Sequence, residues 1–246
     1  MAKRLAVVLG VVLVGSLIVV RAQQYPFWEV LLHSYGGKSD ETPVASMKMG
    51  NHMQMSLKRK LQPGDEQRAQ QIIVAAREVL MQYADVSSAL RDGYKPFYPT
   101  GRIGEEVHYT NYRAGRPADY EHPTSILYTR TPQGMQAVGV MYTARQAATA
   151  DQLNAIAPLS IATWHRHIDF CGAPRSKPLD QQFGPNAKFG AQGSIHTEQA
   201  CKDANGVWIP VVFGWMTHVY PNGKAPNEIW GGMDMPMDAN TDREKM

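Results

Sequence analysis

The stretch Trp164-His165-Arg166-His167-Ile168-Asp169-Phe170-Cys171 is the part of the sequence that best predicts both a structural element and a functional site. As a β-strand it places alternate side chains on opposite faces. His165, His167 and Asp169 then share one face, and the apolar side chains share the other with Arg166. Two imidazoles at this spacing stand about 6–7 Å apart and can bind one metal ion. Asp169 is a candidate third ligand, or a group that orients an imidazole.

A second predicted strand, 207–220, offers further ligands. Met216 and His218 repeat the i, i+2 spacing on one face of this strand. His218 would complete a three-histidine set typical of zinc or copper if the two strands are neighbours, and Met216 is a candidate weak axial ligand. His108, in a predicted strand over 105–112, is the next candidate. Because imidazole binds metal only when neutral, affinity is expected to weaken as the pH falls through about 6.5.

The segment 47–55 concentrates soft ligands. Its sequence Met-Lys-Met-Gly-Asn-His-Met-Gln-Met holds Met47, Met49, His52, Met53 and Met55. Thioethers suit Cu(I), so this segment is a candidate copper site separate from the histidines. The four methionines would share one strand face, and a strand that packs this face on the core is an equal alternative.

The N-terminus predicts export. Lys3 and Arg4 precede an apolar run from Leu5 to Val20, and Val20-Arg21-Ala22 can serve as a cleavage site, so residues 1–22 are predicted to be a signal peptide. An uncleaved membrane anchor is the alternative, and only then is membrane attachment expected. Removal of the leader takes away three basic residues, so 25 Lys and Arg against 22 Asp and Glu become 22 against 22. This balance argues against a nucleic-acid partner and leaves a metal ion as the expected partner.

The two cysteines, Cys171 and Cys201, fit an exported protein with one disulfide. Such a bond would tether the irregular, Pro- and Gly-rich segment that follows Cys171. The competing interpretation makes Cys171 a thiolate ligand, since it lies four residues after His167.

The remaining pattern predicts an α+β fold with a mainly antiparallel sheet and one long amphipathic helix. Helical spacing of apolar residues runs from Asp65 to Leu90, with a possible break at 85–87, and strands follow from Gly104 onward. The expected organisation is an extended Met-rich segment over 23–62, a single domain over 63–232 and a polar tail over 233–246.

Five segments together carry a resemblance: Asp92-Gly93-Tyr94, His108 to Asn111, Pro123 to Tyr128, Val138 to Thr143, and His218. This pattern resembles a group of exported bacterial proteins without an established activity, over roughly residues 60–220. The resemblance implies export and one α+β body, and it supplies no catalytic residues.

Known catalytic motifs are not found. The chain has no G-x-S-x-G elbow, phosphate-binding loop, H-E-x-x-H helix or C-x-x-C-H haem attachment. The leading hypothesis is therefore a periplasmic or secreted protein that binds a transition metal, copper before zinc or iron, for handling or delivery. A mononuclear metalloenzyme, an oxidoreductase or hydrolase using His165, His167 and His218, is the second hypothesis. A metal-free binding module, in which the histidines and methionines are core, is the third.

Overall fold

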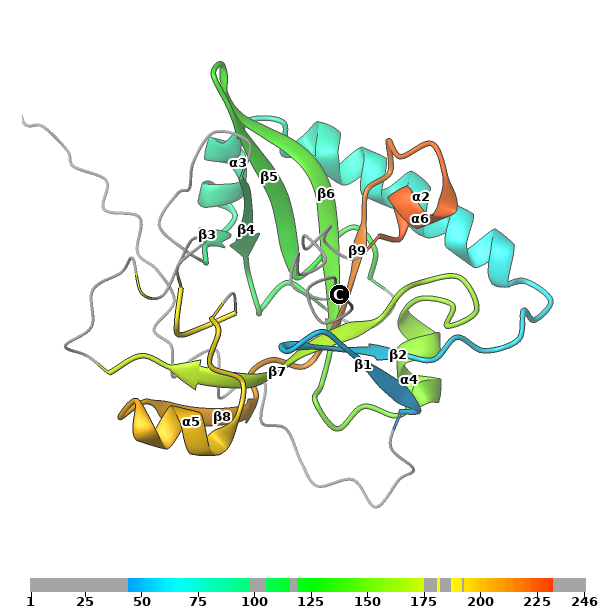
Figure 1. Ribbon diagram of the computed structural model, residues 1–246. Coiled ribbons are helices and arrows are strands. Elements are labelled where there is room, and N and C mark those ends of the chain that lie inside the picture. Colours follow the sequence, from blue (N-terminus) through cyan, green and yellow to red (C-terminus); the bar gives the residue numbers. More distant parts are fainter. Residues whose placement is uncertain are drawn as a thin grey trace, which may run out of the picture.

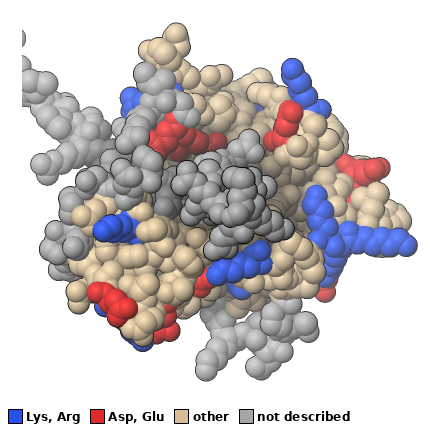
Figure 2. All heavy atoms as spheres, viewed as in Figure 1, with Lys and Arg blue, Asp and Glu red and all other residues tan. Residues whose placement is uncertain are grey.

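A computed structural model describes residues 44–97, 105–115, 119–174, 181, 187–191 and 193–231. The predicted signal peptide, residues 23–43 of the Met-rich segment and the polar tail lie outside these residues. Within them, no helix combines the length and the apolar character that crossing a membrane requires. On the face seen in Figure 2, acidic and basic side chains of the described residues are interspersed.

The fold is α+β, as predicted, and its centre is a nine-stranded antiparallel sheet (Figure 1). The strand order is β1-β2-β7-β9-β6-β5-β4-β3, and β8 pairs with β7 beside this path. The strands are β1 (Ser46–Met49), β2 (Met53–Ser56), β3 (Lys95–Pro96), β4 (Glu106–Thr110), β5 (Ser125–Thr131), β6 (Gly134–Ala144), β7 (His165–Gly172), β8 (Val207–Val211) and β9 (Trp215–Val219). The described helices are α2 (Asp65–Gln82), α3 (Val86–Arg91), α4 (Ala150–Ile156), α5 (Glu198–Asp203) and α6 (Pro226–Ile229).

The long helix predicted over 65–90 is two helices, and the break between them lies at 83–85, slightly before the 85–87 expected. α2 has 18 residues, and it buries Ile72, Ala76 and Val79. Asp85 then caps α3, because its side chain accepts a hydrogen bond of 2.9 Å from the backbone N–H of Ser87. α2 packs against β6 and supplies one wall of the main core.

Alternation along the strands divides the sheet into two faces. On the face toward α2, which we call the helix face, each central strand contributes large apolar or aromatic side chains, among them Tyr109, Tyr128, Tyr142 and Trp215. Their neighbours in the strands point to the opposite face. That face, here called the histidine face, carries Leu127, Met141 and Met216 in a small apolar cluster. It also carries the histidines described below.

The prediction of a single strand over 207–220 is wrong. The chain forms β8 and β9 with a break at 212–214. A Cβ atom at Gly214 would collide with the carbonyl oxygen of Ala144, so the backbone passes close to β6 at this point. β8 pairs with the end of β7, between Ile168 and Gly172, and β9 pairs with its start at His165. β8 and β9 therefore both pair with β7, at different ends of that strand.

The predicted disulfide is confirmed. Cys171 and Cys201 are joined, with an S–S distance of 1.98 Å, and both are fully buried beside Phe189. The bond ties β7 to α5 across 30 residues of sequence. Cys171 is therefore not a thiolate ligand.

Candidate metal centre

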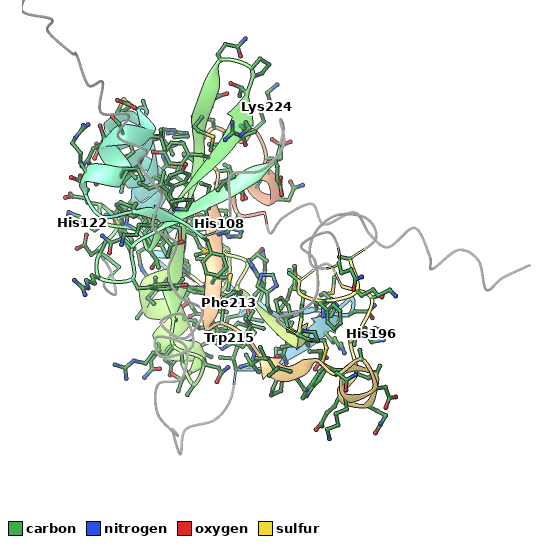
Figure 3. The ribbon with its side chains drawn as sticks, turned by 90° about the vertical axis from the view of Figure 1, so that its left-hand side faces the viewer. His108, His122, His196, Phe213, Trp215 and Lys224 are labelled. Atoms are coloured by element: carbon green, nitrogen blue, oxygen red, sulfur yellow. A yellow bond between two sulfur atoms is a disulfide. The ribbon has the colours of Figure 1, made fainter. Side chains whose placement is uncertain are left out.

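Four imidazoles meet on the histidine face. His165 of β7 lies at the centre: its ring centroid is 5.0 Å from that of His218 in β9 and 5.7 Å from that of His167 in β7. The ring centroid of His108, from β4, lies 5.3 Å from that of His218. Figure 3 places His108 near the middle of the molecule, with His122 and His196 at opposite sides. The three histidines predicted to converge, and the fourth candidate, are thus brought together.

The sheet brings His108 and His218 together across two intervening strands. β5 and β6 lie between β4 and β9, so their ring contact requires a curved sheet whose side chains converge on this face. Gly139 of β6 leaves room for the side chains of Tyr220 and Leu127. A Cβ atom there would lie 2.8 Å from Cδ1 of Tyr220 and 3.1 Å from Cδ1 of Leu127.

Burial keeps the central imidazoles neutral. His165 and His218 are fully buried, and His167 is 6% exposed. Desolvation, assisted by the neighbouring imidazoles, lowers the pKa of His165 to about 3 and that of His167 to about 4. The same causes hold the pKa of His218 well below its usual value. All three rings are therefore neutral at physiological pH. The weakening of metal binding near pH 6.5 stays a prediction.

The ring nitrogens lack the partners that buried imidazoles need. Both nitrogens of His165, both of His218 and Nδ1 of His167 are buried without a hydrogen-bond partner among the described residues. A buried polar atom left unpaired costs about 1–3 kcal/mol. Five such atoms in one cluster indicate a group that completes it.

A carboxylate supports the exposed side of the cluster. Oε1 of Glu106 lies 3.3 Å from Nε2 of His108 and accepts a hydrogen bond of 3.2 Å from the Tyr220 hydroxyl. Holding Nε2 in this way leaves Nδ1 of His108 as its other possible donor atom. Carboxylates that orient a ligating imidazole in this manner are common around metal ions.

Methionines continue the histidine face on both sides. In the sheet register His165 stands opposite Met216 of β9 and Met55 of β2, and His167 stands opposite Met53. His218 stands opposite Met141 of β6. Because directly opposed residues point to the same face, these thioethers lie beside the imidazoles.

The soft-ligand segment is a hairpin and not a single strand. Met47 pairs with Met55 and Met49 with Met53, so the four methionines do share a face, as predicted. His52 lies in the turn and is already engaged: Nε2 is 2.6 Å from the carbonyl oxygen of Gly193, and Nδ1 is 3.4 Å from that of Ile168. The segment adjoins the histidines, since β2 pairs directly with β7.

Asp169 is turned away from the imidazoles. Its φ of 58° is left-handed and interrupts the alternation of β7. Its carboxylate binds Nζ of Lys48 at 2.6 Å, on the hairpin face opposite the methionines. Phe170, predicted to face away, instead lies 5.8 Å from His167 between ring centroids. The structure therefore gives no support to Asp169 as a ligand, because the strand period does not hold at this residue.

The remaining described histidines have other partners. Nδ1 of His122 lies 2.9 Å from Asp119, and Nδ1 of His196 lies 2.9 Å from the carbonyl oxygen of Ser194. His33 lies outside the described residues.

The imidazoles stand close together without pointing their nitrogens at one common centre. Over the described ranges, no group of three or more His, Cys, Asp or Glu side chains is arranged so that it could hold a metal ion as it stands. Two imidazoles bound to one tetrahedral ion have ring centroids about 5 Å apart. The three pairs in ring contact, at 5.0–5.7 Å, are near that value, and one ion shared by all four rings would require the other pairs to approach one another as well as ring rotation.

Comparison of the chain with models of protein families, with curated proteins and with solved structures gives no match. The chemistry of this site therefore has to be argued from its own residues.

Two contributors to the site, Glu106 and Met141, were not predicted. Glu106 shares the alternating face of His108, and that spacing was a usable signal. Met141 lies in an apolar run whose two faces look alike in sequence, so only the pairing with His218 identifies it.

Proposed function

We propose that this chain binds a copper ion through the imidazoles of His108, His165, His167 and His218, and that it holds or delivers the metal. The observation that carries the proposal is the cluster of buried ring nitrogens without partners. A neutral imidazole offers one lone pair, so coordination would use one nitrogen of each ring in a region from which water is largely excluded.

The neighbours of the imidazoles favour copper over harder metals. Met216 and Met141, both 5% exposed, stand opposite His165 and His218 in the sheet. Thioether sulfur is a soft ligand that suits Cu(I), whereas Mg²⁺, Ca²⁺ and Mn²⁺ prefer oxygen. The one carboxylate described above in contact with these rings is Glu106, which orients His108.

The burial of the cluster favours handling over catalysis. Three of the four imidazoles are almost inaccessible, and His108 has a side chain 22% exposed. Four imidazoles can fill a tetrahedral coordination sphere, which leaves no open position for a substrate. A metalloenzyme needs such a position.

The direct test is metal binding by the exported protein. Copper, supplied as Cu(I), and zinc should be titrated separately against metal-free protein while the thermal midpoint and the bound metal are measured. We expect one tightly bound copper per chain, histidine scattering in its X-ray absorption spectrum, and stabilisation by about 2.7 kcal/mol at a hundredfold excess over Kd. Neither metal stabilising the protein would contradict the proposal.

Variants localise the site. His218→Leu removes a central ligand at nearly constant volume, and we expect it to weaken copper binding at least a hundredfold. His122→Ala is the matched control, because this exposed histidine pairs with Asp119 far from the cluster, and its affinity should equal that of the wild type. Equal copper affinity in a folded His218→Leu protein would remove His218 from the site.

A further inference from the structure

We infer that the methionines of the β1–β2 hairpin form a surface Cu(I) site that passes the ion to the buried histidines. This inference rests on the proposed function for its destination. It adds a second, thioether-only site at Met47, Met49, Met53 and Met55, and it assigns the route by which copper reaches the first.

The register of the sheet joins the two sites. The row Met47, Met55, His165, Met216 runs across β1, β2, β7 and β9, each residue directly opposite the next. A second row runs from Met49 through Met53 to His167. Side chains opposed in this way have Cβ atoms about 4.5–5.5 Å apart. An ion can therefore move from one ligand to the next without crossing a gap.

Exposure falls in one direction along these rows. Met47 is 50% exposed and Met49 is 44% exposed, Met53 and Met55 are half-buried, and His165 is fully buried. Two large apolar side chains on an edge strand are costly to leave in water, and an edge strand is where proteins usually place charge. Lys48 supplies such a charge on the opposite face of the same strand, where it binds Asp169. The exposed thioethers are thus confined to the face that leads to the histidines.

The ligands also change in kind along the same direction. The exposed end offers thioethers, which bind Cu(I) but compete poorly for Zn²⁺ and for hard cations. The buried end adds imidazoles that are more strongly donating. Transfer between them is ligand exchange on Cu(I): a copper–sulfur bond breaks as a copper–nitrogen bond forms, and neither an electron nor a proton is exchanged, since the imidazoles are already neutral.

The test compares loading rates. The double variant Met47→Leu/Met49→Leu keeps the apolar volume of two exposed positions, so its fold should be unchanged. Cu(I) is supplied as its bicinchoninate complex, and loss of the coloured complex is followed by stopped flow. We expect loading at least tenfold slower than in the wild type, with the same final histidine-bound copper. Met81→Leu, at a 71% exposed methionine of α2, is the control and should load at the wild-type rate.

The outcomes separate this inference from the proposed function. A normal imidazole spectrum in the wild type with equal loading rates in the double variant would overturn the route alone. A wild-type spectrum with sulfur scattering and no imidazole scattering would overturn the histidine centre, and with it the transfer. Ag(I), a redox-inert probe, should bind wild-type protein with sulfur-only scattering for one of its sites. Retention of that site in Met49→Leu/Met53→Leu would overturn the methionine site itself.

Discussion

The two faces of the sheet differ in how many of their buried polar groups are hydrogen-bonded. On the helix face, the hydroxyls of Tyr94, Tyr128 and Tyr142 donate to the backbone carbonyls of Pro123, Tyr83 and Tyr120, and that of Tyr83 donates to Asp92. Elsewhere in the described residues, single side-chain atoms without a partner remain in three strands: Oγ of Ser56, Nε of Arg130 and Oγ1 of Thr217. On the histidine face, five ring nitrogens of three neighbouring residues have none. The tyrosines of the helix face thus have the polar pairing of a structural core, whereas the histidine face concentrates buried ring nitrogens that have no partner.

The largest difference between the two faces is expected in acid, where the histidine face should lower the free energy of unfolding. Burial lowers the pKa of His165 to about 3 and that of His167 to about 4, and that of His218 is well below normal, whereas in the unfolded chain each titrates near 6.5. Between these values the unfolded chain binds protons that the folded chain does not. The histidine contribution to stability is therefore complete above about pH 6.5 and is lost as the pH falls below it.

At pH 5.0 the expected loss is about 2 kcal/mol for each of His165 and His167, and His218 adds to it in the same direction. Urea unfolding of the metal-free protein at pH 7.5 and 5.0 measures it. The His218→Leu variant should lose part of this sensitivity. Equal free energies of unfolding at the two pH values would mean that the imidazoles are hydrated. The proposed difference between the two faces would then be wrong.

Removing a paired hydroxyl from the helix face should destabilise the protein. Tyr128→Phe leaves the buried carbonyl oxygen of Tyr83 without the donor that now lies 2.7 Å away. We expect the free energy of unfolding to fall by about 2 kcal/mol, measured in urea at pH 7.5. An unchanged value would show that this face tolerates unpaired polar atoms as the other does.

The support of His108 gives a smaller effect, and it acts on metal binding. Glu106→Gln keeps a side chain of the same size but removes the charge that faces Nε2 of His108. Copper affinity should fall about tenfold, or about 1.4 kcal/mol, while the unfolding free energy of the metal-free protein changes little. Competition with a Cu(I) chelator measures the affinity. Glu121→Gln, at an exposed residue outside the cluster, is the control, and equal affinities would separate Glu106 from the site.

The smallest effect is expected where the histidine face loses a polar group. His218→Leu replaces an imidazole that has two unpartnered nitrogens with an apolar side chain of similar volume. Without metal, at pH 7.5, the free energy of unfolding should change by less than about 1 kcal/mol, or rise. A loss like that from Tyr128→Phe would show that His218 has a structural partner.

Much of this arrangement was predictable from local sequence. The i, i+2 spacing identified His165 and His167, and it placed the four methionines on one face of their segment. Helical periodicity predicted α2, a break was expected at 85–87 and lies at 83–85, and the cysteine count predicted the disulfide. Each of these depends on residues close in sequence, or on a pair with one possible partner.

What the sequence did not reveal depends on neighbours and on backbone exceptions. A period of two fixes the faces of a strand but not the strand that lies beside it, so the pairing of β2 with β7 was not predicted. The left-handed φ at Asp169 exchanged the positions expected for Asp169 and Phe170. The break at Gly214 depends on the nearby carbonyl of Ala144, which is far from it in sequence.

The turn between β1 and β2 carries a constraint on length as well as on residue identity. Met49 and Met53 flank Gly50, whose φ of 67° suits glycine, and the pairing of these two methionines fixes the register of the hairpin. An insertion of one residue there would move Met47 and Met49 to the opposite side of the sheet and leave Met53 and Met55 in place. In related chains, therefore, insertions and deletions in this turn should be rare.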